Sequence, residues 1–360
     1  MTVRLAGDVP SLALALVLLA HGLTASPATT GPAIDWQQLN LQGAWKATPE
    51  LVTIAETAVQ RYPLDRNPNM WGQLVGAYTV LARHAVETRD YTRARDLLDD
   101  YFANEQDWAP SAPRNFLRAY YLEAISILEG FQRAAELFDT YHEAEGAGVW
   151  RWRGVEVFLL IAAHTLTEAG RAEDARALFA EAMIGNPKSL NYVVRGEWKY
   201  YNSIGHQENA LAAARLGFAL CDYDEGHIRY WSERVMQGFM GILEPGKAQA
   251  FAAAQTDPGA PNPLADVPLP QVTDEGKQSL LANAEGDSMA LVHANLLLGQ
   301  WDEALQAAGR MLSDAAPHKV DQAIRMVAKC FKAKDLNLIR ANRFIEYSRT
   351  GEGENPVNTF

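Results

Sequence analysis

The sequence predicts an all-α protein, an α-solenoid built from antiparallel helix pairs. Apolar residues recur with helical spacing, and glycine or proline interrupts these stripes at intervals along the chain. No segment shows the alternating pattern of a strand above background. In addition, 360 residues are more than one compact core usually buries, which favours an array of repeated units or more than one domain.

The first 28 residues have the layout of a secretory signal peptide. Arg4 precedes the apolar run Leu12–Ala20, and small residues follow it. The run is shorter than the about 20 residues that span a bilayer. We therefore expect export to the periplasm or the extracellular space, cleavage near Ala25 or Ala28, and no transmembrane span in the mature chain. A first core helix, or a signal retained as an anchor, are the alternatives.

Residues 35–68 form the predicted N-terminal segment. The pattern there indicates one amphipathic helix that starts at about Pro49. A repeat array needs such an end cap to cover the apolar face of its first unit.

The clearest helix pair runs from Leu159 to Pro187. Gly170 breaks the apolar stripe, and the second helix follows it. Small residues at Ala163 and Ala175 let the two helices approach closely, and a large aromatic residue fills the adjoining space. Pro187 then ends the second helix, since proline cannot continue one.

The same order of small, large and breaker residues recurs along the chain. The copies cover Tyr78–Tyr101, Leu122–Tyr141, Trp198–Gly217 and Leu291–Met311, with a degenerate pair over Val320–Tyr347. This order resembles the tetratricopeptide repeat, although the copies are spaced more widely than the usual period of about 34 residues. The resemblance implies a superhelix of this kind, with one array at 69–245 and further helix pairs at 286–348.

Between these two arrays the pattern lapses. Prolines recur between Asp257 and Pro270, and each one removes a backbone donor. We therefore expect a proline-rich linker or loop over 246–285. The last residues, 349–360, form a polar tail that is expected to fray.

Charge and motifs exclude several classes of function. The net charge is −12 and no basic run is present, which argues against a nucleic-acid partner. The chain has no His-Glu-x-x-His, phosphate-binding glycine loop or Gly-x-Ser-x-Gly motif, so we expect no catalytic residues and no cofactor. The loop Asp222–His227 carries residues that could bind a divalent cation, but a plain turn between repeats is favoured, and no metal site is predicted. Cys221 and Cys330 should be buried, unpaired thiols, because the repeats place them several helices apart.

A candidate binding face follows from the repeat pattern. On each first helix, the stripe beside the buried one should face the concave side of the array. This stripe contains Arg83, Glu123, His164, Tyr192, Arg195, Lys199, Asn202 and His293. Its cations resemble those with which some tetratricopeptide grooves bind a peptide carboxylate. The alternative is that they only solvate a helix face.

The favoured function is therefore a non-catalytic exported scaffold that binds a protein or peptide in a concave groove. An alternative is an α/α-toroid enzyme that acts on a polysaccharide, with Trp150 and Trp152 lining its bowl beside a carboxylate pair. A third possibility is a subunit that only stabilises a larger complex. Against the enzyme, Trp198, Tyr201 and Trp301 are expected in the repeat core, where they would not contact a sugar.

Overall fold

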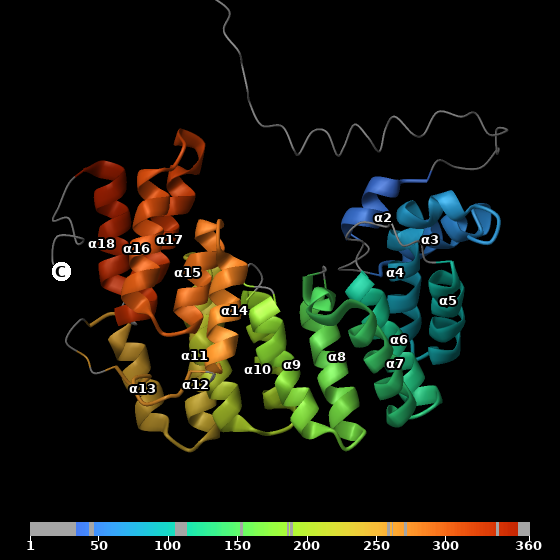
Figure 1. The fold of residues 1–360 in the computed structure, drawn as a ribbon, viewed down its shortest axis with the longest axis horizontal. Helices are drawn as coiled ribbons and strands as arrows, with labels where there is room; N and C mark the ends of the chain where they lie inside the picture. The colour runs from blue at the N-terminus through green and yellow to red at the C-terminus, as the bar shows by residue number, and fades with distance from the viewer. Residues whose placement is uncertain are drawn as a thin grey trace, which may run out of the picture. The chain divides into compact units, whose positions relative to one another are not determined.

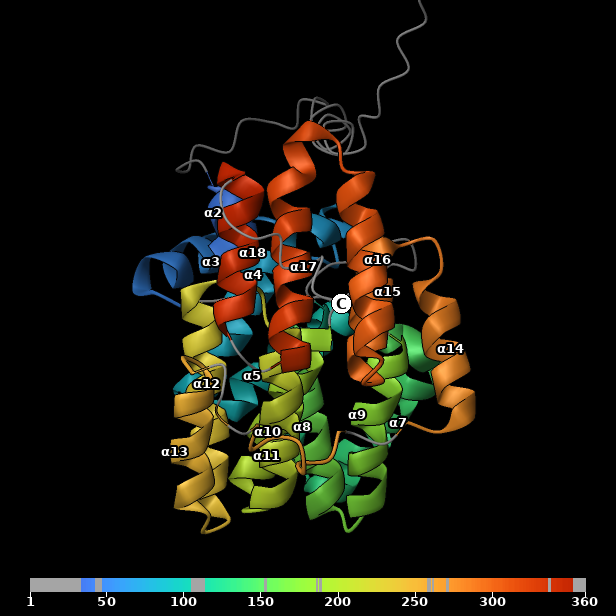
Figure 2. The ribbon, with the colours of Figure 1, turned by 90° about the vertical axis from the view of Figure 1, so that its left-hand side faces the viewer.

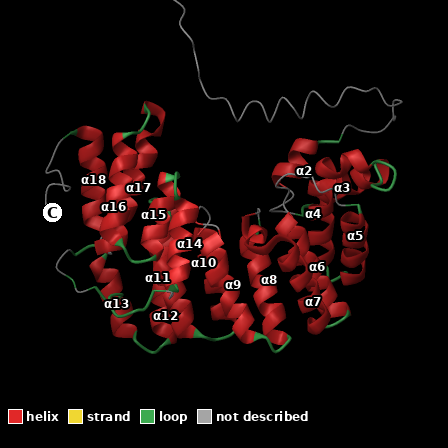
Figure 3. Ribbon diagram, viewed as in Figure 1, coloured by secondary structure: helices red, strands yellow, loops and turns green. Residues whose placement is uncertain are grey.

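A computed structural model shows the architecture of the chain. It describes residues 34–42, 47–104, 114–151, 154–185, 187, 190–257, 260, 262–269, 272–335 and 338–351. Within these ranges the chain forms 17 α-helices and no strand (Figures 1 and 3), which confirms the predicted all-α class. No helix in the described ranges is long and apolar enough to cross a membrane. The predicted signal peptide and residues 352–360 lie outside the described residues.

The helices follow one another with short connections. In chain order they are α2 (Trp36–Gln42), α3 (Pro49–Arg61), α4 (Trp71–Glu87), α5 (Tyr91–Ala103), α6 (Arg114–Leu128), α7 (Phe131–Glu145), α8 (Val155–Glu168), α9 (Ala172–Gly185), α10 (Leu190–Ser203), α11 (Gln207–Leu220), α12 (Glu225–Gly241), α13 (Pro245–Ala254), α14 (Asp274–Ala284), α15 (Ser288–Leu297), α16 (Trp301–Ser313), α17 (Val320–Asp335) and α18 (Leu338–Thr350). Short 3₁₀ turns lie at Pro68–Met70 (η1), Gly146–Arg151 (η2) and Pro317–Lys319 (η4).

Local sequence signals set many of the helix ends. Asp90 caps α5 by accepting a hydrogen bond from the backbone N–H of Arg93, and Asp287 caps α15 in the same way. Gly170 separates α8 from α9 with a φ of 81°, a conformation that favours glycine. The predicted start of a helix at Pro49 is confirmed, whereas the preceding helix α2 was not predicted.

Consecutive helices pack on each other, and the first helices of successive pairs also form contacts. Helix α6 packs on α4, α8 packs on α6, and α10 packs on α8. Gly196 permits close approach at the last of these contacts, because a Cβ there would lie 3.1 Å from the backbone oxygen of Glu156. The core contains Trp198 and Tyr201 as predicted, while Trp301 is only half-buried.

The packing order changes after α12. Helix α13 packs on α12, but α14 packs on α9, and both α15 and α17 pack on α11. Figure 2 shows α14 beside α15 and near α9. Helices α14, α15 and α17 therefore contact α9 and α11, in the middle of the chain.

The linker predicted over 246–285 is too wide. Helices α13 and α14 occupy much of that range, and no helix is found among the described residues between them. Pro245 is tolerated because it lies in the first turn of α13, where its missing N–H has no partner in any case. The connection is also anchored, since Leu264 and Val267 are buried. At the other end of the chain, α18 extends to Thr350, two residues into the predicted tail.

Candidate functional site

The strongest grouping of predicted binding residues lies where α10 packs on α8. The carboxylate of Glu156, on α8, accepts a hydrogen bond of 2.6 Å from Lys199 Nζ and lies 3.4 Å from Arg195 Nε. The side chain of Glu156 is only 15% exposed, whereas those of Arg195 and Lys199 are 43% and 37% exposed. One largely buried carboxylate thus holds two accessible cations.

Aromatic rings from α10 and α12 extend this group. The guanidinium of Arg195 lies 4.9 Å from the centre of the Tyr230 ring. Arg234 lies 3.8 Å from the same ring and 5.2 Å from the ring of Trp198. Such cation–π contacts hold the guanidinium groups in place. The Nε atom of Arg195 is buried, so a partner would reach the terminal N–H groups of this side chain. We call Glu156, Arg195, Lys199, Trp198, Tyr230 and Arg234 the α10 cluster.

Of the six members of the α10 cluster, sequence reasoning predicted Arg195 and Lys199 as binding residues, assigned Trp198 to the core, and missed the other three. Tyr230 and Arg234 are four residues apart and therefore share a face of α12, which the helical period could have indicated. Glu156 could not be found in this way, because only the packing of α8 on α10 brings it to the two cations. Tyr192 and Asn202, the other two residues predicted on this face, also lie on α10, and Tyr192 is 47% exposed.

Two further predicted residues, Arg83 and Glu123, lie near Tyr120. Arg83 forms an ion pair of 2.7 Å with Glu87, one turn along α4. Burial raises the pKa of Tyr120 to about 12, with smaller effects from the charges of Arg83, Glu87 and Glu123. Burial also raises the pKa of Glu123. These residues come together between α4 and α6, separately from the α10 cluster.

His164 makes a polar contact between α8 and α10. Its Nε2 atom lies 3.0 Å from the hydroxyl oxygen of Ser203, and its ring meets the ring of Tyr200 edge-on at 5.3 Å. Burial lowers the pKa of His164. This histidine therefore has a structural role in helix packing.

The prediction that His293 lies on the binding face is wrong. Its side chain is buried, because α15 packs against both α11 and α17. The Nε2 atom of His293 lies 3.1 Å from Lys329 Nζ. Burial, together with the charge of Lys329, lowers the pKa of His293 to about 3, so the ring is neutral at pH 7.

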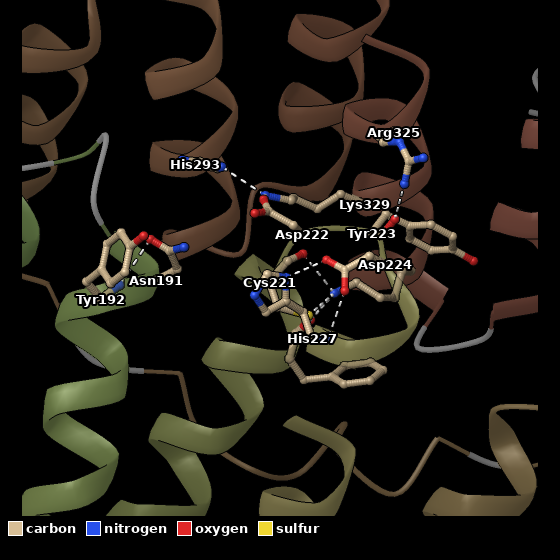
Figure 4. A network of polar contacts seen from close by, with 12 residues as sticks. Asn191, Tyr192, Cys221, Asp222, Tyr223, Asp224, His227, His293, Arg325 and Lys329 are labelled. Atoms are coloured by element: carbon tan, nitrogen blue, oxygen red, sulfur yellow. Dashed lines mark hydrogen bonds and ion pairs between the residues drawn. The ribbon is translucent and has the colours of Figure 1, made fainter. Parts of the chain in front are cut away.

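His293 belongs to a second group, which we call the buried junction: Cys221, His293, Lys329 and Lys332 are buried, and Asp222 lies at the exposed edge of the group. Figure 4 shows Lys329 between Asp222 and His293. Lys329 also binds Asp222 at 3.1 Å, and its side chain is only 2% exposed. Partial burial opposes ionisation of Asp222, but the charge and hydrogen bond of Lys329 outweigh it and lower the pKa of this carboxyl.

Lys332 is fully buried at the end of α11. Its Nζ atom donates to the backbone oxygens of Phe218 and Cys221 and lies 3.0 Å from Cys221 Sγ. The last carbonyls of a helix have no partner within the helix and attract positive charge. Lys332 therefore caps α11 from a helix more than 100 residues away in the sequence.

The acidic loop Asp222–His227 also forms contacts that stabilise the fold. Asp224 caps α12 and pairs with His227, and Arg325 donates to the backbone oxygen of Tyr223 at 3.1 Å. Across the ranges that the structure describes, no three His, Cys, Asp or Glu side chains are grouped as metal ligands.

Cys221 and Cys330 are buried and unpaired, as predicted. Burial raises the pKa of the Cys330 thiol to about 12. The two sulfurs thus differ in their surroundings, since that of Cys221 faces an amine.

Trp150, which the enzyme alternative required on an open surface, is fully buried. Its indole N–H donates to Glu181 at 3.0 Å, and the same carboxylate pairs with His142. Trp152 lies outside the described residues. The sugar-binding bowl inferred from these tryptophans is therefore not supported at Trp150.

Comparison of the chain with protein-family models, curated proteins and solved structures found no match. The tetratricopeptide-like assignment remains a prediction.

Proposed function

We propose that this chain is a non-catalytic, exported scaffold of tetratricopeptide type, and that its α10 cluster binds an acidic segment of a protein partner. One observation carries the proposal. Arg195 and Lys199 remain accessible while sharing the single carboxylate of Glu156. The chain as a whole carries a net charge of −12, whereas Arg195 and Lys199 leave one positive charge in excess beside Glu156.

The donors of these two cations exceed what Glu156 uses. A lysine ammonium has three donors and an arginine guanidinium has five. A partner carboxylate could accept from the remaining donors and form charge-assisted hydrogen bonds, which are stronger than neutral ones. Because both cations are partly solvated, added salt should weaken this interaction.

Aromatic rings beside the cations favour a peptide over a small anion. Tyr192 lies one turn before Arg195 on α10 and is 47% exposed, and Tyr230 packs under Arg195. Tyrosine, tryptophan and arginine are the residues that most often dominate the binding energy of protein interfaces. An acidic segment with apolar neighbours would therefore match both parts of the surface.

A charge-reversal experiment tests the proposal. The variant Arg195→Glu, Lys199→Glu is compared with wild type and with Arg176→Glu, Lys247→Glu. The control changes the net charge equally at sites of similar exposure, 45% and 42%, where each cation pairs with a carboxylate three residues before it. Binding of a fluorescent glutamate-rich peptide is measured by anisotropy at low and high salt.

We expect wild type and control to bind the peptide and the α10 variant to lose about tenfold or more in affinity, since two charge-assisted contacts are reversed. A pull-down from native extract with the same three proteins then identifies the partner. Equal peptide binding by all three proteins would show that the α10 cluster is not the binding surface.

A further inference from the structure

The buried junction places a nucleophilic sulfur beside an amine. Lys332 Nζ lies 3.0 Å from Cys221 Sγ, and the two residues are 0% and 2% exposed. Two backbone carbonyls, of Phe218 and Cys221, hold the Nζ atom, and the Phe218 ring lies 4.8 Å from it. The amine is therefore fixed in position next to the sulfur.

We propose that oxidation joins Cys221 Sγ and Lys332 Nζ through one oxygen atom, as a covalent N–O–S bridge. The bridge would fasten the end of α11 to α17, which are 111 positions apart at these residues. It is a property of the buried junction and is independent of peptide binding at the α10 cluster.

The reaction balances with a peroxide as oxidant. One hydrogen peroxide oxidises the Cys221 thiol to a sulfenic acid, and its O–O bond breaks to release water. A second peroxide oxidises the Lys332 amine to a hydroxylamine and also releases water. The hydroxylamine oxygen then attacks the sulfenyl sulfur and the S–OH bond breaks. The departing hydroxide takes the hydroxylamine proton and leaves as a third water.

The surroundings favour this product over the other oxidation products of cysteine. An inserted oxygen spans the present gap between nitrogen and sulfur, whereas a direct N–S bond would have to draw the two helices together. Burial lowers the pKa of Lys332, which raises the fraction of neutral amine that can react. The neighbour of the Cys221 sulfur is this amine and not the thiol of Cys330, so a disulfide would require rearrangement.

Mass spectrometry tests the bridge on the full chain. The protein is purified under reducing conditions, treated with hydrogen peroxide and analysed both intact and after proteolysis. We expect one linked peptide that contains Cys221 and Lys332, with a mass gain of one oxygen atom less two hydrogen atoms. A thiol reductant should reverse the gain.

Three variants sharpen the test. Cys221→Ser and Lys332→Met should both abolish the linked peptide, and Cys330→Ser should retain it. Because the Lys332 variant could unfold, the wild-type peptide map and the nearly isosteric Cys221→Ser variant decide the result alone. A simple gain of oxygen at Cys221, a Cys221–Cys330 disulfide, or no change in mass after peroxide treatment would each overturn the proposal.

Discussion

The carboxyl group of Glu197 yields a pH-dependent prediction for stability. Glu197 lies on α10 and is 9% exposed, and its Oε2 atom forms no hydrogen bond within the part of the chain that the structure describes. Burial raises the pKa of this group to about 8 from an ordinary value of 4.5. A carboxyl group in this position is retained in its neutral form up to and beyond neutral pH.

The sign of the effect follows from proton binding. Between pH 4.5 and 8 the folded chain keeps the proton on Glu197, whereas the unfolded chain loses it. Stability therefore falls as the pH rises through this window, because the unfolded state binds fewer protons. Below pH 4.5 both states are protonated and the contribution disappears.

Glu197→Gln removes this titration and keeps the shape of the side chain. At pH 7, about 2.5 pH units above the ordinary pKa of 4.5, ionisation of Glu197 lowers the free energy of the unfolded wild-type chain by about 3 kcal/mol. The variant lacks this effect and should therefore be more stable than wild type by about 3 kcal/mol. At pH 4 the two proteins should be nearly equal. Urea unfolding, followed by far-ultraviolet circular dichroism at several pH values, measures the difference.

Glu208→Gln is the matched control, since Glu208 is exposed on the next helix. It should leave the stability unchanged within about 0.5 kcal/mol at every pH. If the difference in stability between Glu197→Gln and wild type were the same at pH 4 and pH 8, the inference that Glu197 is protonated in the folded chain would be refuted.

Two other predictions concern packing and export. Gly217→Ala should destabilise the protein by about 1–3 kcal/mol, because the new Cβ would lie 2.3 Å from the Trp231 ring. The matched change Gly309→Ala in α16 places a Cβ with no atom within 4 Å and should stabilise the protein by up to about 1 kcal/mol. Thermal unfolding of both variants measures this, and a stabilised Gly217→Ala would contradict the close contact of α11 with α12. Expression of the full chain in a bacterium should yield a periplasmic product whose first residue, found by N-terminal sequencing, is Ser26 or Thr29. An intact N-terminus in the cytoplasm would contradict the signal peptide.

Short-range patterns were sufficient to predict most of the helices, but not α2, α13 or α14. The break at Gly170 and the start at Pro49 depend on a few neighbouring residues, whose backbone preferences and caps act within one or two turns. The same local reasoning placed Arg195 and Lys199 on one face of α10. The same reasoning predicted a linker that is too long, because the prolines of 257–270 led to a non-helical assignment that also covered α13 and α14 on either side.

Burial of charged groups could not be predicted in this way. The repeat pattern predicted that His293 faces a groove, and no local pattern distinguishes Lys329 and Lys332 from solvated lysines on an amphipathic helix. The packing of α15 and α17 on α11 buries all three side chains, and their partners come from segments far away in the chain.

By itself, the sequence determined the all-α class, several helix breaks such as Gly170, and the cations of α10, because hydrophobic period and helix capping are local properties. Only the tertiary structure decided that Glu156 pairs with those cations, that Trp150 is buried, and that α14 to α18 pack back onto the first array. The physical reason is that charge pairing and burial depend on which surfaces meet, and these surfaces belong to helices distant in the sequence.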